Sequence, residues 1–286
     1  MFPNRSILGG APFNVARHLK AFKQNPVLIT RLGSDTLGEE VLNEMVESGM
    51  ETVGVQCCKR YPTGRVQVHL VENSHTFDIL PEQAYDYIHP AVVRMITLSS
   101  NPALVYFGTL AQRLRVSSRA LKNVNRSTCA PKFLDVNLRA PWYEASTIES
   151  SLHEADIAKL NEEEFAEIAQ ILALEGEDKF SQARTFVRQF NLDQIIVTSG
   201  ESGAWQLNGD GKKTQSAASR TPIKLVDTVG AGDGFAAVYM LGAMQRWPVA
   251  KILERANAFA AAICEIRGAV PDHNDFYDPF LQDWGV

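Results

Sequence analysis

The sequence predicts an α/β fold: a mainly parallel sheet with helices on both faces, joined by a small antiparallel hairpin. After residue 80, short apolar runs of strand length alternate with helical patterns, as is typical of parallel sheets. An earlier segment has the two-residue periodicity of a half-exposed strand. Neither an internal repeat nor a low-complexity linker is present, so we expect residues 1–286 to form a single domain.

The composition is that of an ordinary globular protein. The 286 residues are 45% hydrophobic and 21% charged, which allows a sizeable core. The net charge of −5 comes without a run of Lys or Arg and disfavours a nucleic-acid partner. No apolar stretch approaches the ~20 residues that span a bilayer, and residues 1–10 lack a secretory signal. Four cysteines without metal-ligand spacing favour a reducing, cytoplasmic location.

Glycine-containing turns introduce the first two predicted helices. Residues 9–14 form one such turn, and a helix with an apolar side follows over residues 15–22. The apolar run at residues 27–30 predicts a buried strand. The next turn, residues 33–38, leads into a helix through residues 41–46.

Residues 52–82 differ in character and predict an antiparallel flap. Apolar residues at 66, 68 and 70 alternate with polar residues at 65, 67 and 69. A turn at residues 72–74 leads to a second run at residues 76–80, which together indicate a hairpin. The hairpin is either a lid that covers a ligand and excludes water, or an edge that only extends the sheet.

Four apolar runs, at residues 104–107, 133–136, 157–160 and 195–198, predict the main parallel strands. Helical patterns between them include residues 165–174 and 180–190. Ligands of such sheets bind beyond the carboxyl ends of the strands. Polar or glycine residues stand there at Asp135, Asn137, Arg139, Asn161, Glu164, Thr198, Gly200 and Gly203. Asn, Thr and Gly after a strand more often form turns than contact a ligand. Ordinary turns and a ligand site therefore both stay open as interpretations.

The stretch at residues 226–235 combines three glycines with two aspartates and runs into a helix. A helix start after a glycine turn presents free N–H groups at the positive end of the helix dipole, which suits an anion. Asp233 lies where the helix begins, so its carboxylate should be ionised and able to accept a proton. This combination is what phosphoryl transfer to a hydroxyl requires. An ordinary helix cap explains the local pattern equally well.

The last long helical pattern, residues 249–266, turns an apolar side toward the core. Asn257 stands on it among small residues. Those small residues either let a flat ligand approach closely or allow tight helix packing.

Spacing argues against several other site types. A Walker A loop that used Gly211 and Lys212, within residues 209–214, would need an earlier glycine at Gln206, and a dinucleotide fingerprint would need one at Phe235. The six histidines include no pair four residues apart with an adjacent glutamate, which disfavours a zinc hydrolase. A Gly-x-Ser-x-Gly elbow is also absent, which disfavours a serine hydrolase of that kind.

Motifs in a fixed order cover nearly the whole chain. Gly9-Gly10-x-x-x-Asn14 and Asp227-Thr-Val-Gly-Ala-Gly-Asp233 match the N-terminal and C-terminal signatures of the ribokinase-like (PfkB) carbohydrate kinases. Between them lie matching segments at residues 33–38, 62–64, 135–139, 161–164 and 198–203. Gly-Gly-Ala-Pro-x-Asn-Val-Ala and Asp-x-Asn-Leu-Arg are most similar to the fructokinase branch. The resemblance implies a ribokinase-like three-layer fold with a small β lid.

The resemblance also implies roles in ATP-dependent phosphorylation of a sugar. Asp233 would be the general base. The N–H groups of Gly230, Ala231 and Gly232 would form an anion hole for the transferring phosphate. Contacts to the sugar or the phosphate are implied for Gly10, Asn14, Asp35 and Arg139.

For the cofactors, the resemblance implies ATP, Mg²⁺ and, less directly, a monovalent cation such as K⁺. Asn161 would help to place the nucleotide phosphates, and Glu164 would hold Mg²⁺ through water. Asp227 and the carbonyl of Val229 would bind the monovalent cation. The nucleotide groove would be lined by Thr198, Gly200, Gly203 and Asn257.

The N-terminal start departs from the family pattern. Relatives begin with a buried strand that ends in an acidic sugar ligand, whereas the eight residues before Gly9 contain no carboxylate. We expect this strand to be missing through a truncation just before Phe2. The lid would then consist mainly of residues 64–80 and offer less surface for lid-mediated dimers, so a homodimer is an open alternative.

Together these features predict an ATP-dependent kinase for fructose or a similar ketose, with a small-molecule sugar as its partner and no nucleic-acid or membrane partner. Within the family, the alternatives are a kinase for 2-keto-3-deoxygluconate or for a nucleoside. From other classes, the alternatives are a catalytically silent nucleotide- or sugar-binding homologue and a nicotinamide dehydrogenase, the latter disfavoured by glycine spacing.

Overall fold

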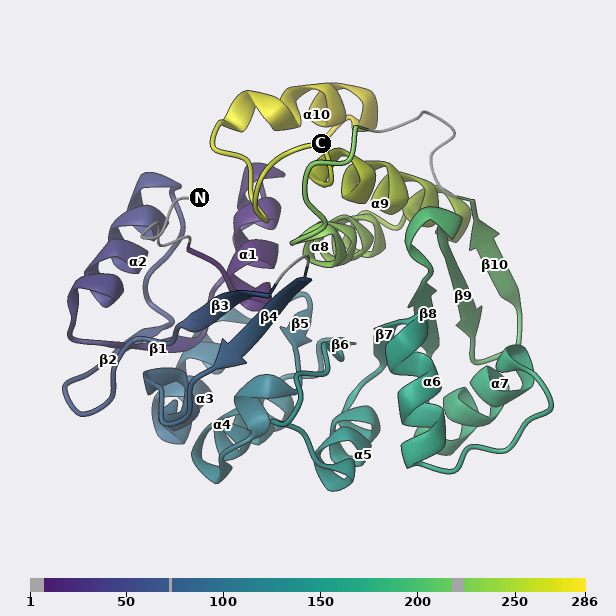
Figure 1. Cartoon of the computed structure of the whole chain (residues 1–286), viewed down its shortest axis with the longest axis horizontal. Coiled ribbons are helices and arrows are strands. Elements are labelled where there is room, and N and C mark those ends of the chain that lie inside the picture. Colours follow the sequence, from purple (N-terminus) through teal and green to yellow (C-terminus); the bar gives the residue numbers. More distant parts are fainter. Residues whose placement is uncertain (1–7, 72–73, 218–223) are drawn as a thin grey trace. The chain divides into compact units, whose positions relative to one another are not determined.

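The computed structural model describes residues 8–71, 74–217 and 224–286 (Figure 1). The chain falls into two compact units. Unit 1 comprises Met1–Pro26, Pro102–Leu110 and Ala130–Val286. Unit 2 comprises Val27–Asn101 and Ala111–Cys129. Each unit has its own strands and helices.

Unit 1 is built on a six-stranded sheet with the order β10-β9-β8-β7-β6-β5. Its strands are β5 Val105–Phe107, β6 Lys132–Asp135, β7 Ile157–Asn161, β8 Gln194–Thr198, β9 Ala204–Asn208 and β10 Lys213–Ser216. β5 to β8 are parallel, and β9 and β10 continue the sheet in antiparallel orientation. The side chains of β7 before Asn161 are all buried, as expected for a strand covered on both faces. The predicted parallel strands are therefore confirmed.

Helices of unit 1 enclose its core. They are α1 Ala11–Ala21, α5 Ala145–Glu154, α6 Glu162–Ile171, α7 Lys179–Phe190, α8 Ala231–Met244, α9 Val249–Ile263 and α10 Asp278–Trp284. α8 packs against both α1 and α9, and the three helices share one hydrophobic cluster. α8 has no apolar stripe on one side alone, because Gly234 to Gly242 are buried all round. Asp233 is the only charged residue of this helix, so it has no polar face to turn to water.

Unit 2 contains two small two-stranded sheets and three α-helices among its described residues. They are β1 Thr30–Gly33, α2 Thr36–Glu47, β2 Val55–Cys58, β3 Val66–Val71, β4 Ser74–Ile79, α3 Pro90–Ser100 and α4 Arg115–Ser127. β1 pairs with β2 in parallel, and α3 packs against α4. The strand predicted at residues 27–30 begins only at Thr30, because its partner strand begins opposite it at Val55. Val27 forms an isolated bridge with Glu51.

The predicted hairpin is confirmed, since β3 and β4 pair antiparallel with Val66 opposite Ile79. Most of the predicted turn, residues 72 and 73, lies outside the described residues, and so do residues 1–7, on which the expected loss of a first strand depends. The lid role of the hairpin and the single-domain organisation stay predictions. Among the helices of the described ranges, none has the length and hydrophobicity that a bilayer-spanning segment needs.

Candidate active site in unit 1

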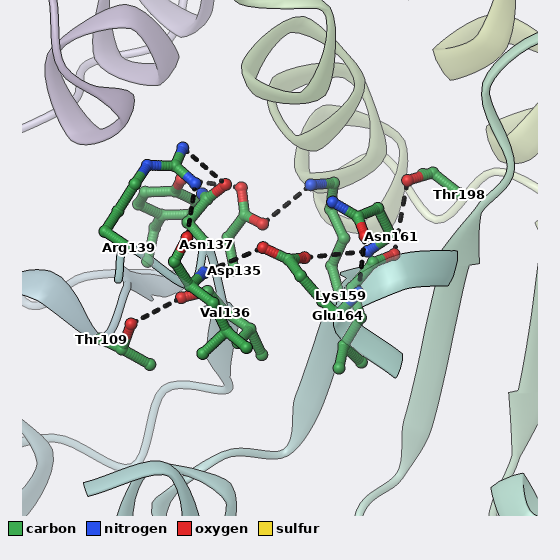
Figure 2. A network of polar contacts seen from close by, with 12 residues as sticks. Thr109, Asp135, Val136, Asn137, Arg139, Lys159, Asn161, Glu164 and Thr198 are labelled. Carbon is green, nitrogen blue, oxygen red and sulfur yellow. Dashed lines mark hydrogen bonds and ion pairs between the residues drawn. The ribbon is translucent and has the colours of Figure 1, made fainter. Parts of the chain in front are cut away.

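The carboxyl ends of three parallel strands bring polar residues to one edge of the unit 1 sheet (Figure 2). Asp135 ends β6, Asn161 ends β7 and Thr198 ends β8. Asn161 lies directly opposite Thr198 in the strand register. The structure therefore places these sequence-predicted residues where parallel α/β sheets bind their ligands.

Asp233 lies in the first turn of α8, where Asn14 of α1 holds its carboxylate. The side-chain amide of Asn14 donates a hydrogen bond to Oδ2 of Asp233 at 2.7 Å. Asn14 is 4% exposed, and its Oδ1 has no hydrogen-bond partner among the described residues. Buried polar atoms of native proteins are rarely left unpaired, which indicates that Oδ1 is kept for a ligand. Asn14 thus orients the carboxylate and presents an acceptor suited to a hydroxyl group.

Burial is the main reason that the pKa of Asp233 rises from its ordinary value to about 6. The hydrogen bond from Asn14 opposes this rise in pKa, and the charge of Asp135 adds to it. The cations Lys159 and Arg139 also oppose it. At neutral pH the carboxylate is mostly ionised yet close to its pKa, which is the condition that favours a general base.

A glycine turn precedes Asp233 and forms the start of α8. Gly230 has a φ of 82°, and a Cβ there would come within 2.3 Å of the Cβ of Ala269, so glycine is required on both grounds. The N–H of Ala231 donates to the carbonyl of Thr228 at 3.3 Å and is already engaged. The N–H of Gly232 lies in the first helical turn, where no carbonyl of the helix can accept it. The turn therefore presents donors to an anion, although Ala231 is a weaker candidate than predicted.

Asp227 anchors the loop that leads into this turn. Its carboxylate accepts the N–H groups of Val229 at 3.0 Å and Gly268 at 3.1 Å. The N–H groups of Val226 and Asp227 both donate to the carbonyl of Cys264. These bonds order the loop through protein atoms. The monovalent cation that the family resemblance implies for Asp227 and Val229 stays a prediction.

Glu164 links the loop after β6 to the start of α6. Its Oε1 accepts the N–H of Leu138 at 2.9 Å, and its Oε2 accepts the N–H of Asn161 at 3.0 Å. The side chain of Asn161 in turn accepts the N–H of Glu164 at 2.8 Å, which completes a capping box. Burial raises the pKa of Glu164, and these hydrogen bonds work against the rise.

The donors around Glu164 fit Mg²⁺ held through water. Each oxygen of its carboxylate keeps a lone pair beyond the hydrogen bond that it accepts. Among the described residues, no group of three or more His, Cys, Asp and Glu side chains is placed to hold a metal ion. Mg²⁺ is commonly held by one or two carboxylates, waters and substrate phosphates rather than by a full protein cage.

A buried ion pair in this region was not predicted. Nζ of Lys159 on β7 lies 2.8 Å from Oδ1 of Asp135, and their side chains are 5% and 0% exposed. The hydroxyl of Tyr106 donates to the other oxygen of Asp135 at 3.0 Å. The signal that could have revealed the pair is a lysine inside an apolar strand run, because a buried lysine needs a partner.

The predicted nucleotide residues lie near the antiparallel side of the sheet. Thr198 ends β8, and the turn to β9 carries Gly200 and Gly203 with φ angles of 51° and 91°. No atom lies within 4 Å of where a Cβ at Gly200 would stand, so its backbone is open to a ligand. The side chain of Asn257 on α9 donates to the carbonyl of Ser216 at the end of β10. The structure thus distributes these four residues over β8, the β8–β9 turn and α9.

Gly10 and Arg139 occupy exposed positions of unit 1. Gly10 precedes α1 with a φ of 112°, and its carbonyl accepts the N–H of Asn14 at 2.9 Å. Arg139 donates to the carbonyl of Leu138 at 2.9 Å and to Oδ1 of Asn137 at 3.5 Å. Its guanidinium lies close enough to Asp233 to lower the pKa of that carboxyl.

Asp35 belongs to unit 2 and serves there as a helix cap. Its Oδ1 accepts the N–H of Gly38 at 2.9 Å and the hydroxyl of Thr63 at 2.6 Å, while Oδ2 accepts the N–H of Thr63 at 2.8 Å. Burial alone would raise the pKa of Asp35, but these hydrogen bonds outweigh it and lower the pKa. This structural role is sufficient to explain the residue, and its predicted contact with the sugar stays a prediction.

Comparison with known proteins assigns the chain to a family. A model of the pfkB family of carbohydrate kinases matches residues 4–275. The chain is 25% identical over 236 residues to fructokinase-2 of Solanum lycopersicum, covering 79% of this chain and 70% of that protein. It is 22% identical over 270 residues to 5-dehydro-2-deoxygluconokinase of Clostridium beijerinckii, covering 91% and 78%, respectively.

Solved structures share the fold. An E. coli chain named for ribokinase II, solved in complex with ATP and Mg²⁺, superposes with a TM-score of 0.80 at 17% identity. The match covers 99% of this chain and 93% of that chain. It confirms the predicted ribokinase-like α/β fold.

Proposed function

Because the chain belongs to the pfkB family of carbohydrate kinases and is an ATP-dependent phosphotransferase, we propose that it phosphorylates a primary hydroxyl of fructose or a similar ketose. The observation that carries this proposal is the carboxylate of Asp233. It stands at the amino end of α8, beside a glycine turn, and Asn14 holds it at 2.7 Å. The family match spans residues of both units, which supports the further proposal of a single kinase domain.

In the proposed reaction, Asp233 takes the proton of the attacking hydroxyl. Asn14 fixes the direction of the carboxylate, and its free Oδ1 accepts a second hydroxyl of the sugar. The N–H groups at Gly230 and Gly232, together with Arg139, stabilise the negative charge of the transferring phosphoryl group. Donors that are fixed by the fold in this way stabilise developing charge without reorganisation at the moment of reaction.

The nucleotide side of the site is proposed for the edge formed by β7, β8 and α9. Asn161 would contact the phosphates, while Thr198, Gly200, Gly203 and Asn257 would line the groove for the rest of the nucleotide. Bound Mg²⁺ would neutralise phosphate charge, with Glu164 holding it through water. K⁺ at Asp227 and Val229 is a further proposal without support from the comparisons.

The choice of sugar rests on the sequence motifs and on two relatives. The motifs and the similarity to fructokinase-2 favour a ketose. The similarity to 5-dehydro-2-deoxygluconokinase keeps a sugar acid such as 2-keto-3-deoxygluconate as the second candidate. Arg139, which is exposed near Asp233, would suit the carboxylate of such a substrate.

A sugar panel with ATP and Mg²⁺ tests the proposal. We expect ATP consumption that depends on fructose or a related ketose more strongly than on 2-keto-3-deoxygluconate or nucleosides. Asp233→Asn should lower kcat by about 10²–10⁴-fold, because it removes the proton acceptor. Asp210→Asn, which changes an exposed carboxylate in the β9–β10 turn, serves as the matched control and should leave kcat unchanged.

Near-wild-type turnover of Asp233→Asn would exclude Asp233 as the base. A wild-type protein that consumes ATP only with a sugar acid or a nucleoside would overturn the assignment of the acceptor but not that of the reaction.

A further inference from the structure

Lys159 is a buried cation that the proposed reaction has not used. It lies on β7 with its whole residue 4% exposed, and Asp135 accepts a hydrogen bond from its Nζ at 2.8 Å (Figure 2). Within the described residues this is the only hydrogen bond that the ammonium group makes, although it has three N–H donors. Two donors are therefore available to another acceptor.

The ammonium of Lys159 lies beside the glycine turn of the proposed anion hole. A Cβ placed on Gly232 would stand 3.6 Å from Nζ, in ordinary van der Waals contact. Glycine at this position thus leaves the space next to the ammonium free. The ammonium also interacts electrostatically with Asp233 and Glu164, in addition to its stronger interaction with Asp135.

Carboxylates outnumber cations around the glycine turn, so a phosphoryl group bound there needs a neighbouring cation. Three carboxylates, those of Asp135, Glu164 and Asp233, share the region with two cations, Lys159 and Arg139. A phosphoryl group adds further negative charge. Arg139 is exposed, so water and salt screen its charge, whereas the buried charge of Lys159 acts through a medium of lower dielectric constant.

We propose that Lys159 is a further catalytic residue, whose ammonium contacts the transferring phosphoryl group at the Gly230–Gly232 turn and stabilises the charge of the transition state. The proposal rests on the proposed kinase function. Lys159 keeps its proton throughout and forms no covalent bond. Asp135 is its positioning residue, and Tyr106 holds Asp135 in place through a hydrogen bond of 3.0 Å.

A purely structural ion pair is the competing explanation, and paired substitutions separate the two. Lys159→Met alone leaves the buried carboxylate of Asp135 without its partner, which is strongly destabilising. The double variant Lys159→Met/Asp135→Asn removes both charges and is expected to fold. If the pair is only structural, the double variant should regain wild-type turnover.

The experiment measures kcat, the KM values for sugar and ATP, and thermal unfolding for Lys159→Met, Lys159→Arg and the double variant. We expect the folded double variant to lose about 10²–10³-fold in kcat, as for loss of one oxyanion donor, with changes in KM below about tenfold. Lys159→Arg should recover part of kcat because it keeps the charge.

The matched control is Lys132→Met/Asp156→Asn, which removes a partly exposed ion pair of 3.6 Å at the opposite, amino ends of β6 and β7 and should leave kcat unchanged. A folded double variant of Lys159 and Asp135 with kcat within about threefold of wild type would overturn the role of Lys159 while the kinase function stands, since one lost oxyanion donor costs far more. Absence of sugar-dependent ATP consumption in the wild type would overturn both.

Discussion

The ionisation of Asp233 depends on a balance between burial and its neighbours. Burial and the charge of Asp135 favour the protonated carboxyl, whereas Asn14, Lys159 and Arg139 favour the carboxylate. Asn14 is the one of these residues that contacts Asp233 by a direct hydrogen bond. The ionisation of such a general base should determine how turnover depends on pH.

We predict that kcat/KM rises with pH through a limb near pH 6, the pKa of Asp233, because the base must be ionised to accept a proton. Asn14→Leu removes a hydrogen bond that favours the carboxylate, so the limb should move to higher pH. Initial rates from pH 5 to 8 at subsaturating sugar measure this shift independently of any loss in absolute rate.

Asn25→Leu provides the control for this measurement, since Asn25 is exposed and bonds only weakly to Lys20 at 3.5 Å. The rise of kcat/KM with pH in Asn25→Leu should occur at the same pH as in the wild type. An unchanged limb in Asn14→Leu would show that the hydrogen bond does not set the ionisation of the base.

At the scale of elements, the sequence predicted the order of strands and helices and the glycine turn of α8, because these follow from local periodicity and turn chemistry. It could not separate glycines that a ligand needs from glycines that packing needs. A Cβ on Gly33 would come within 2.5 Å of the backbone nitrogen of Thr63, and one on Gly38 within 2.9 Å of the Thr63 hydroxyl oxygen. Two of the recognised motifs therefore fit together as a packing unit inside unit 2.

The ion-pair partner of Lys159 is a second feature that could not be predicted from the sequence. Periodicity placed it correctly within a buried strand but gave no partner for its charge. That partner, Asp135, lies on the neighbouring strand β6, and a single sequence does not show which strands are adjacent. The parts of the candidate site that come from one segment of sequence were therefore predictable. The ion pair between two neighbouring strands was not.

The requirement for glycine at position 230, in the turn before α8, can be tested by substitution. We predict that Gly230→Ala lowers both kcat and the free energy of unfolding, because its methyl group would meet Ala269 at 2.3 Å in addition to the positive φ of 82°. Gly211→Ala is the matched control, with a φ of 78° and no atom within 4 Å of its Cβ position. Urea unfolding should show a further loss of about 1–3 kcal/mol in Gly230→Ala from overpacking.

Equal losses of unfolding free energy in the two variants would mean that the backbone angle alone requires glycine. A normal kcat in Gly230→Ala would argue against this turn as the anion hole.

At the scale of the whole chain, a buried histidine joins the two ends of the sequence within unit 1. Nδ1 of His18 lies 2.8 Å from the hydroxyl of Tyr277, and Nε2 lies 3.0 Å from the carbonyl of Ala269. Because a carbonyl can only accept, Nε2 carries the proton and Nδ1 accepts from the tyrosine. Ala269 is also the residue against which Gly230 packs, so this contact supports the start of α8.

The same histidine should make the stability of the protein sensitive to acid. Burial lowers the pKa of His18 to about 3, against the opposing effect of its bond to Ala269. In the unfolded chain the imidazole takes up a proton below its ordinary pKa of about 6.5, whereas the folded chain does not until near pH 3. The unfolded state thus binds more protons over this range, and stability is lost as the pH falls.

We therefore predict that His18→Gln, which cannot titrate, loses less unfolding free energy between pH 7 and pH 5 than the wild type, by about 2 kcal/mol. Urea unfolding at the two pH values measures the difference within each protein, so a general destabilisation by the substitution cancels. His153→Gln is the control, because His153 is exposed, and its pH dependence should match the wild type. An identical pH dependence in His18→Gln would mean that His18 becomes protonated in the folded chain, and that its bond with Tyr277 adapts to the charge.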